Sequence, residues 1–113
     1  DTLTFVDDQI GHPTFTTDLA PVLRDLAISR RPGVFHVTNQ GAVSWHQFAQ
    51  EVAKAAGADP ARINPSSTAD FGATYPAPRP ANSVLDNMAM RLSGLPETRD
   101  FRAPLAELVS RLV

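Results

Sequence analysis

The sequence predicts an α/β fold with few strands and about four helices. Across 113 residues, 42% are hydrophobic and 19% charged, which is typical of one soluble domain with a modest core. Short β-branched and aromatic runs alternate with segments whose apolar residues recur at helical spacing, and glycines and prolines separate them. This order predicts an α/β layer followed by a helical tail.

The N-terminal third predicts a strand, a loop and a helix. The strand covers Leu3–Val6, and a loop over Asp7–Thr14 follows because glycine and proline interrupt it. The next helix has Asp18 as its N-cap, since Pro21 then falls in the first turn, where its missing N–H costs nothing. Its apolar face comprises Leu19, Val22, Leu23, Leu26 and Ala27.

The middle of the chain predicts a second strand and a second helix. The β-branched run Val34–Thr38 has a period of two and is bounded by turn residues, which favours a strand. Ser44 and Gln47 form the pattern of a capping box, so a helix starts after Ser44. Gly57 supplies the left-handed residue that ends this helix. Its apolar face comprises Trp45, Phe48, Ala49, Val52 and Ala56.

The last part predicts a short extended piece from Ile63, an irregular loop over residues 64–80 with one brief edge strand, and two helices. Asp86 is the expected cap of a short helix through Met88 and Leu92, with Gly94 just past its end. The apolar face of the final helix comprises Leu105, Leu108, Val109 and Leu112.

Composition argues against several classes of partner. The net charge is −2 and Lys54 is the only lysine, so the chain lacks the basic stripe that nucleic acid requires. No apolar run approaches the roughly 20 residues of a membrane-spanning helix. The absence of cysteine excludes disulfides and agrees with a cytoplasmic location.

Motifs for catalysis, cofactors and metals are absent. The glycines are too widely spaced for a dinucleotide fingerprint or a P-loop, so no cofactor site is expected. His12, His36 and His46 never form an i, i+4 pair with a nearby acid, so no metal site is expected either. The capping role of Ser44 already accounts for that hydroxyl, and we assign no catalytic residue.

Arg79 stands between Pro78 and Pro80. Proline restricts both itself and the residue before it, so the arginine is held on a stiff loop at low entropic cost. The planar guanidinium matches phosphate or carboxylate oxygens. The alternative is a solvated arginine in a surface connection.

The loop Asp7–Thr14 is a second candidate site. Ligand sites of α/β folds gather where strands end, and Gln9, His12 and Thr14 offer neutral hydrogen bonds to a sugar or a base there. The alternative is a loop whose polar residues only form turns and cap the next helix.

Four sequence blocks stand in a specific order, at residues 6–20, 33–38, 44–49 and 79–87. In this order they resemble the C-terminal portion of the dTDP-4-dehydrorhamnose reductases, a family of extended short-chain dehydrogenases/reductases. The resemblance covers nearly the whole chain, and its last block, Arg79-Pro80-Ala81-Asn82-Ser83, is the most specific. It implies that residues 1–113 are a single substrate-binding region of an extended Rossmann-type reductase, without the N-terminal half.

The resemblance also implies a function. Such enzymes reduce dTDP-4-keto-L-rhamnose to dTDP-L-rhamnose with NADPH or NADH, which the N-terminal Rossmann half holds. Arg79 resembles the arginine that contacts the substrate pyrophosphate, Asn82 and Ser83 resemble polar support for its loop, and the segment from Gln9 to Thr14 resembles a loop near the sugar. The catalytic tyrosine and lysine lie upstream in the family, so this chain alone is expected to be inactive.

Other interpretations stay open. The chain also fits a non-catalytic nucleotide-sugar-binding or regulatory relative, a related epimerase or dehydratase, or an interaction module without a ligand. The expected partners are a dTDP-sugar and the N-terminal half. Self-association of the isolated chain is a further expectation, because unpaired strand edges are templates for another strand.

Overall fold

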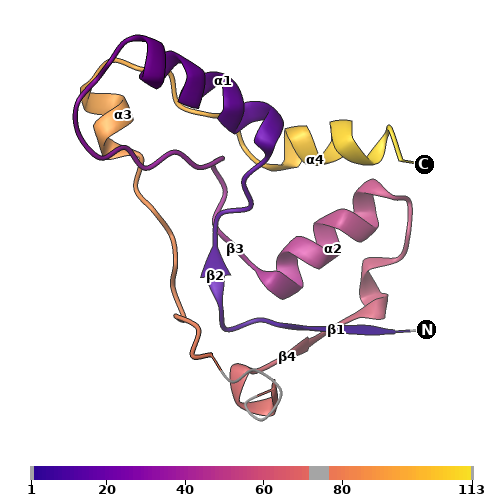
Figure 1. Cartoon of the computed structure of the whole chain (residues 1–113). Coiled ribbons are helices and arrows are strands. Elements are labelled where there is room, and N and C mark those ends of the chain that lie inside the picture. The colour runs from indigo at the N-terminus through magenta and orange to yellow at the C-terminus, as the bar shows by residue number, and fades with distance from the viewer. Residues whose placement is uncertain (1, 72–76, 113) are drawn as a thin grey trace.

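The computed structural model describes residues 2–71 and 77–112 and has α/β architecture (Figure 1). Its elements are β1 (Leu3–Val6), β2 (Ile10–Gly11), α1 (Thr16–Ile28), β3 (Val43–Ser44), α2 (Trp45–Ala55), β4 (Ile63–Ser66), α3 (Met88–Leu92) and α4 (Arg102–Val109), with short 3-10 helices at Pro60–Arg62 and Thr68–Phe71. None of the described helices has the length and apolar character needed to cross a membrane.

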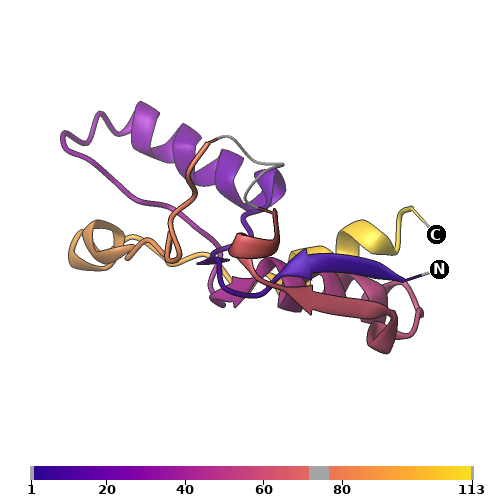
Figure 2. The same ribbon diagram turned by 90° about the horizontal axis from the view of Figure 1, so that it is seen from below.

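The strands form two small sheets. β1 pairs with β4 in parallel, with Leu3 opposite Ile63 and Phe5 opposite Pro65. The pairing extends one residue further, since the Asp7 amide donates to the Ser66 carbonyl at 2.9 Å. β2 pairs with β3 in antiparallel fashion. α2 runs along the β1–β4 sheet, as Figure 2 shows from below. The extended piece predicted from Ile63 is confirmed as β4.

The capping box is confirmed. Ser44 Oγ accepts a hydrogen bond from the Gln47 amide at 3.0 Å, and Gln47 Oε1 accepts one from the Ser44 amide at 3.0 Å. Ser44 is buried, and its hydroxyl donates to Asp7 Oδ1 at 2.5 Å. The cap therefore joins the start of α2 to the end of β1. Gly57, with φ of +70°, follows the end of α2 as predicted.

The hydrophobic core lies between α2 and α4. Phe101 is fully buried, and its ring meets the ring of Phe48 edge to face, with centroids 5.8 Å apart. Leu105 and Val109 of α4 join this core as predicted, whereas Leu108 and Leu112 are exposed.

The predicted cap of α1 is wrong. The helix begins at Thr16, and Phe15 is the N-cap residue, with no side-chain cap bond. Asp18 lies inside the helix, where its carboxylate accepts hydrogen bonds from Asn39 at 2.7 Å and from Arg99 at 3.0 Å. The Asp18 side chain therefore binds Asn39 and Arg99, which are distant in sequence, instead of capping the helix.

Two further predictions are also wrong. Residues 34–38 form no strand, because no described segment pairs with them, and Val34 is 82% exposed. Asp86 does not cap α3. The N-cap position is Asn87, and Asp86 instead accepts a hydrogen bond from Arg91 at 2.6 Å.

Both predicted loops contain short elements of regular secondary structure. The first predicted loop contains the strand Ile10–Gly11, and the second contains part of β4 and a 3-10 helix, with residues 72–76 outside the described residues. The sequence does not predict the strand Ile10–Gly11, because this strand depends on pairing with a distant segment.

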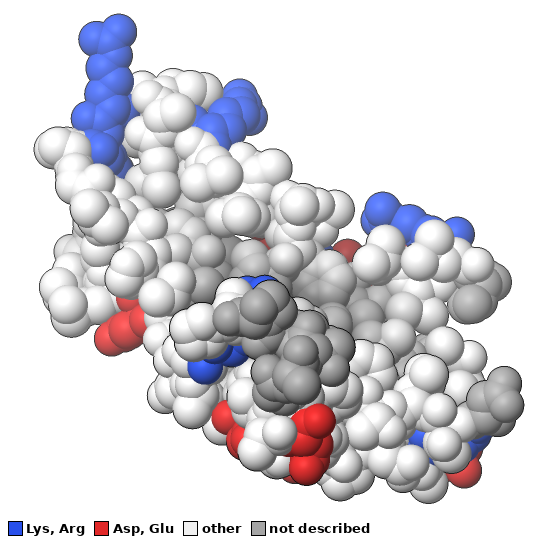
Figure 3. Space-filling model, turned by 60° about the horizontal axis from the view of Figure 1, so that its bottom comes forward, with Lys and Arg blue, Asp and Glu red and all other residues white. Residues whose placement is uncertain are grey.

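The rest of the described chain covers α1 only in part, and apolar side chains of this helix stay exposed. No residue of this helix is buried, and Leu23 on its predicted apolar face is 51% exposed. The radius of gyration is 16.3 Å, whereas a compact domain of this length has about 13 Å. α1 and α3 form an arm at one end of the molecule (Figure 1). Charged side chains of both signs are dispersed over the face in Figure 3.

Among the described glycines, Gly41 is expected to be the least replaceable. Its φ is +93°, and an added Cβ would lie 2.7 Å from Asp100 Oδ2 and 2.9 Å from Phe101 Cδ1. We expect Gly41→Ala to lower the free energy of unfolding by roughly 2–4 kcal/mol in urea titrations. Gly57→Ala is the control, because its φ is also positive but nothing lies within 4 Å. It should cost about 1 kcal/mol, and equal losses would contradict the packing argument.

Acid stability should depend on Arg99. Its guanidinium donates to Asp18 at 3.0 Å and to Glu107 at 2.7 Å, and these hydrogen bonds lower the pKa of both carboxyl groups. A carboxyl with a lowered folded-state pKa stabilises the fold above its ordinary pKa of about 4, and that contribution is lost as the pH falls through the lowered value. Arg99→Gln should therefore flatten the fall of the melting temperature between about pH 5 and pH 2.5.

Arg24→Gln is the matched control for this experiment. Arg24 is exposed on α1 and forms no ion pair among the described residues, so its variant should keep the profile of the original chain. Parallel profiles for Arg99→Gln and the original chain would show that the two ion pairs do not contribute.

Candidate functional site

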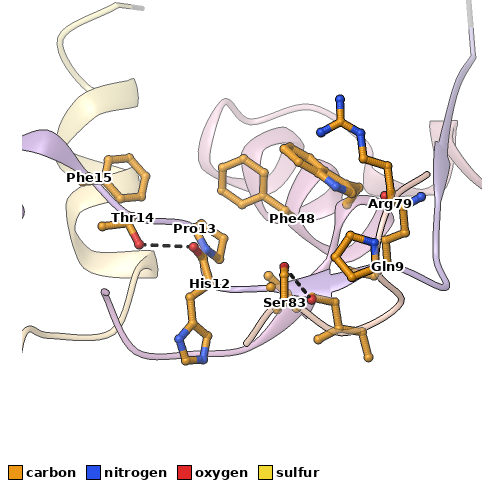
Figure 4. A pocket seen from close by; sticks show the side chains of 14 residues that line it. Gln9, His12, Pro13, Thr14, Phe15, Phe48, Arg79 and Ser83 are labelled. Atoms are coloured by element: carbon orange, nitrogen blue, oxygen red, sulfur yellow. Dashed lines mark hydrogen bonds between the residues drawn. The ribbon is translucent and has the colours of Figure 1, made fainter. Parts of the chain in front are cut away.

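A pocket of about 600 Å³ lies between β2, the loop that follows it, the start of α2 and the segment Arg79–Ser83. Figure 4 shows the side chains around it. Of the six predicted site residues, five line this pocket: Gln9, His12, Thr14, Arg79 and Ser83. The structure thus brings together two loops that are about 70 residues apart in the sequence. A role in binding stays a prediction for each residue.

Backbone hydrogen bonds hold the second loop against β2. The Ile10 amide donates to the Ala81 carbonyl at 2.9 Å, and the Ser83 amide donates to the Ile10 carbonyl at 2.8 Å. Asn82 therefore pairs with Ile10 in parallel, like an added strand. Gly11 permits this close approach, because a Cβ there would lie 2.8 Å from Ser83 Oγ.

Arg79 is exposed and forms no hydrogen bond or ion pair with a described residue. Figure 4 shows its side chain extending on the side of the pocket where Phe48 lies. Its flanking prolines restrict the backbone, as the sequence predicts. No described residue uses the five N–H donors of this guanidinium, and phosphate matches their planar arrangement.

The loop after β1 uses most of its polar groups internally. Gln9 donates to Thr68 Oγ1 at 3.0 Å, and Thr14 donates to the His12 carbonyl at 3.2 Å. Hydrogen bonds from the Thr68 side chain and amide lower the pKa of Asp8. Asp8 is therefore a structural carboxylate that fixes the loop on the 3-10 helix at Thr68–Phe71.

The other two predicted residues have different surroundings. His12 Nδ1 lies 2.9 Å from Thr38 Oγ1, which fixes the imidazole ring. Asn82 does not line the pocket, and its Oδ1 accepts from the Val84 amide at 2.9 Å. Asn82 thus shapes the loop that carries Arg79, and its role as polar support for substrate binding stays a prediction.

Aromatic residues form a wall that the sequence did not indicate. Phe15, Trp45 and Phe48 line the pocket, and Trp45 is 56% exposed. Helical periodicity placed Trp45 and Phe48 on one apolar face, but periodicity does not show which part of a face stays uncovered. Such rings provide apolar area for the flat face of a base or a sugar.

A second pocket of about 490 Å³ lies between β1 and α2. Leu3, Phe5 and Val52 give it an apolar lining, and it shares Trp45 and Phe48 with the first pocket. Within the described ranges, no group of three or more His, Asp or Glu residues is arranged to hold a metal ion. The described residues also hold no glycine-rich strand-to-helix turn that would fit a dinucleotide.

The chain matches one family model over its whole length. Residues 1–113 match the family described as the RmlD substrate binding domain.

Curated relatives are similar to this chain over part of their own length. The chain is 47% identical over 105 residues to a probable dTDP-4,6-dihydroxy-2-methyloxan-3-one 4-ketoreductase of Streptomyces antibioticus, covering 90% of this chain and 34% of the relative. It is 42% identical over 112 residues to a dTDP-4-dehydrorhamnose reductase of Streptomyces griseus, covering 95% and 36%. The chain therefore spans about a third of the length of these relatives.

A solved structure agrees in fold. The dTDP-4-dehydrorhamnose reductase of Clostridium acetobutylicum superposes with a TM-score of 0.89 at 36% identity, covering 99% of this chain and 39% of that one.

The contact between Gly11 and Ser83 predicts a coupled pair of substitutions. Ser83 Oγ donates to the Ile10 carbonyl at 3.1 Å, so Ser83→Ala should cost about 1 kcal/mol of unfolding free energy. Gly11→Ala should cost a similar amount, because its Cβ would displace the same hydroxyl. The double variant should cost little more than either single one, since among the described residues beyond Ile10 and His12 only the Ser83 hydroxyl lies within 4 Å of that Cβ. Additive losses in urea titrations would contradict the contact.

Proposed function

We propose that this chain, which belongs to the RmlD substrate binding domain family, is the nucleotide-sugar-binding part of a dTDP-4-dehydrorhamnose reductase. In this proposal residues 1–113 form one substrate-binding region, and the whole enzyme reduces dTDP-4-keto-L-rhamnose to dTDP-L-rhamnose. The observation that supports it most is the Arg79 guanidinium, held between two prolines at the edge of a pocket with neutral polar groups.

The chemistry of the pocket suits a dTDP-sugar. Arg79 offers donors to the diphosphate. The aromatic wall offers Trp45 and Phe48 to a flat ring face, and His12 lies within reach of the same pocket. A ligand with one charged group, one flat base and several hydroxyl groups would therefore find a matching surface for each.

The hydride would come from NADPH or NADH. The solved Bacillus anthracis dTDP-4-dehydrorhamnose reductase, which is 30% identical to this chain with a TM-score of 0.86, is a complex with NADP and has 37% of its length covered. The described residues of this chain hold no turn that fits a dinucleotide, so we assign the cofactor to an N-terminal Rossmann half. The role of this chain is then to bind and orient the sugar.

The incompletely covered arm suits an interface with that half. α1 leaves Leu23 and Ile28 exposed, and residues 34–38 have no described strand partner. An apolar helix face and an unpaired extended segment are the features that a neighbouring α/β sheet would cover.

We also propose a cytoplasmic location. Self-association of the isolated chain stays a prediction.

The sugar itself has two candidates. The names of similar proteins include a dTDP-4-dehydrorhamnose reductase and a dTDP-4-keto-6-deoxy-D-glucose reductase of Streptomyces niveus, the latter 36% identical over 108 residues. A reductase of a different dTDP-ketosugar is therefore our second candidate. Product analysis with each ketosugar distinguishes the two, and a non-catalytic relative would reduce neither.

The Arg79 assignment is tested by calorimetric titration of the complete protein that contains this chain. We expect Arg79→Gln to weaken dTDP binding about 10- to 100-fold, because a hydrogen bond to a charged group contributes about 1.5–3 kcal/mol. Arg79→Lys should bind with intermediate affinity, since it keeps the charge without the planar geometry.

The control is Arg111→Gln, which removes an exposed arginine that belongs neither to the pocket lining nor to the arm and should leave dTDP affinity unchanged. The affinity for NADPH should be unchanged in all three variants. Equal dTDP affinity of Arg79→Gln and the original protein would refute the assignment.

A further inference from the structure

The second pocket is an apolar groove along α2 that no described side chain fills. Its wall on the sheet includes Leu3 and Phe5, which are two positions apart on β1 and therefore share one face. Its wall on α2 is a complete helical stripe, which consists of Trp45, Phe48, Ala49, Val52 and Ala53. Ile63 of β4 is 8% exposed, whereas Leu3 is 58% exposed, so the face of β1 is the less covered part of the sheet.

The shape of the groove indicates which kind of element fits it. Large apolar surfaces that stay open to water usually mark a contact with another element. Ala49 and Ala53 lie in the lining, and their small side chains let a neighbouring backbone approach α2 closely. The lining side chains of β1 stand on the face of the sheet, where helices pack, and not at its backbone edge, where strands add. A helix with an apolar stripe therefore fits this groove.

The direction of β1 shows which part of the complete protein lies nearest to the groove. Asp7, just after β1, accepts a hydrogen bond from Ser44 at the start of α2. At the other end of β1, Leu3 pairs with Ile63, which follows α2 and the 3-10 helix after it. β1 therefore runs opposite in direction to α2, as Figure 1 shows. A chain that leads into β1 thus arrives at the end of the groove formed by Leu3.

The length of the relatives shows that such a chain has to be accommodated. This chain spans about a third of their length, and in the function proposed above the N-terminal half precedes β1. We propose that the groove binds an amphipathic helix that directly precedes β1 in the complete protein and runs parallel to α2 before it turns into β1. From the proposed function, this inference uses only the presence of an N-terminal half ahead of β1.

The dimensions of the groove limit the length of this helix. The stripe on α2 extends from Trp45 to Ala53, which is about 12 Å at about 1.5 Å per residue. A helix of about 8–12 residues covers that length. Connections between a helix and a strand commonly have about 2–6 residues. The helix and its turn should therefore lie within about 20 residues ahead of Leu3.

This contact would connect the N-terminal half to the candidate site. Trp45 and Phe48 line both the groove and the pocket that includes Arg79. A helix in the groove therefore packs against two of the side chains that form the aromatic wall. The groove lining includes no residue of α1 or α3, so this contact is separate from the arm.

Thiol labelling of the complete protein that contains this chain tests whether the groove is covered. The chain has no cysteine, so single cysteines are introduced after any cysteine of the N-terminal half has been replaced by serine. Ala58 is exposed and lines the groove, whereas Ala55 is exposed and does not. We expect maleimide to react about 100-fold more slowly with Ala58→Cys than with Ala55→Cys, because a covered thiol reacts only when the groove opens.

A third variant tests the opposite wall. Leu3→Cys should be protected to a similar extent, although Leu3 is more than half exposed in the chain described here. Melting curves by circular dichroism identify the variants that are folded, and rates are compared among those only. Equal labelling rates at the groove positions and at position 55 would overturn the proposal.

Photo-crosslinking in the complete protein identifies what covers the groove. A benzophenone side chain is introduced in place of Ala58 or of Trp45, which line opposite ends of the groove. Mass spectrometry should locate both cross-links in the same polypeptide, within about 20 residues ahead of Leu3. The cross-link from position 45 should lie about two helical turns further ahead than the one from position 58. A covalent dimer, a cross-link to another part of the N-terminal half, or the reverse order would contradict the proposal.

Titration of the original complete protein with dTDP separates this proposal from the proposed function. If dTDP binds while the groove positions label freely, the helix contact fails and the proposed function stands. If dTDP does not bind while the groove is protected and the cross-links lie in the expected order, the proposed function fails and the helix contact stands.

Discussion

The arrangement of this molecule depends on the side-chain amide of Asn39, which is fully buried. Its oxygen accepts from the Phe15 amide at 2.8 Å, and its nitrogen donates to Asp18 at 2.7 Å and to the Arg99 carbonyl at 3.0 Å. One side chain thus satisfies groups from the start of α1 and from the segment before α4. A buried amide without these partners would be costly, so the three segments have to meet at this point.

The hydrogen bonds of Asn39 and the strand pairing of Ile10 determine the shape of the pocket. Phe15 ends the loop that forms one wall, and its amide is one of the groups that Asn39 binds. Ile10 pairs with Ser44 on one side and with Asn82 on the other, so a single strand residue places the start of α2 next to the loop that carries Arg79. Backbone pairing therefore sets the relative position of these two walls of the pocket.

Local chemistry was predictable and distant pairing was not. The Ser44–Gln47 capping box involves residues three positions apart, and the structure matches the prediction. The prediction of a strand at Val34–Thr38 failed because a strand needs a partner, which the described residues do not supply. For the site, residue chemistry predicts roles for Arg79 and His12, and both line the pocket. The contact between Thr38 and Asn87 spans 49 residues, and the sequence carries no signal for it.

Pro65 has a consequence for how wide the β1–β4 sheet can become. Ser66 directs its carbonyl toward the end of β1, and backbone direction alternates along a strand, so the nitrogen of Pro65 faces outward. Proline has no N–H, and a third strand arriving at this side would find a missing donor at the middle of β4. Pro65 therefore disfavours strand addition at the outer side of β4, and a third strand of this sheet would pair at the free edge of β1 instead.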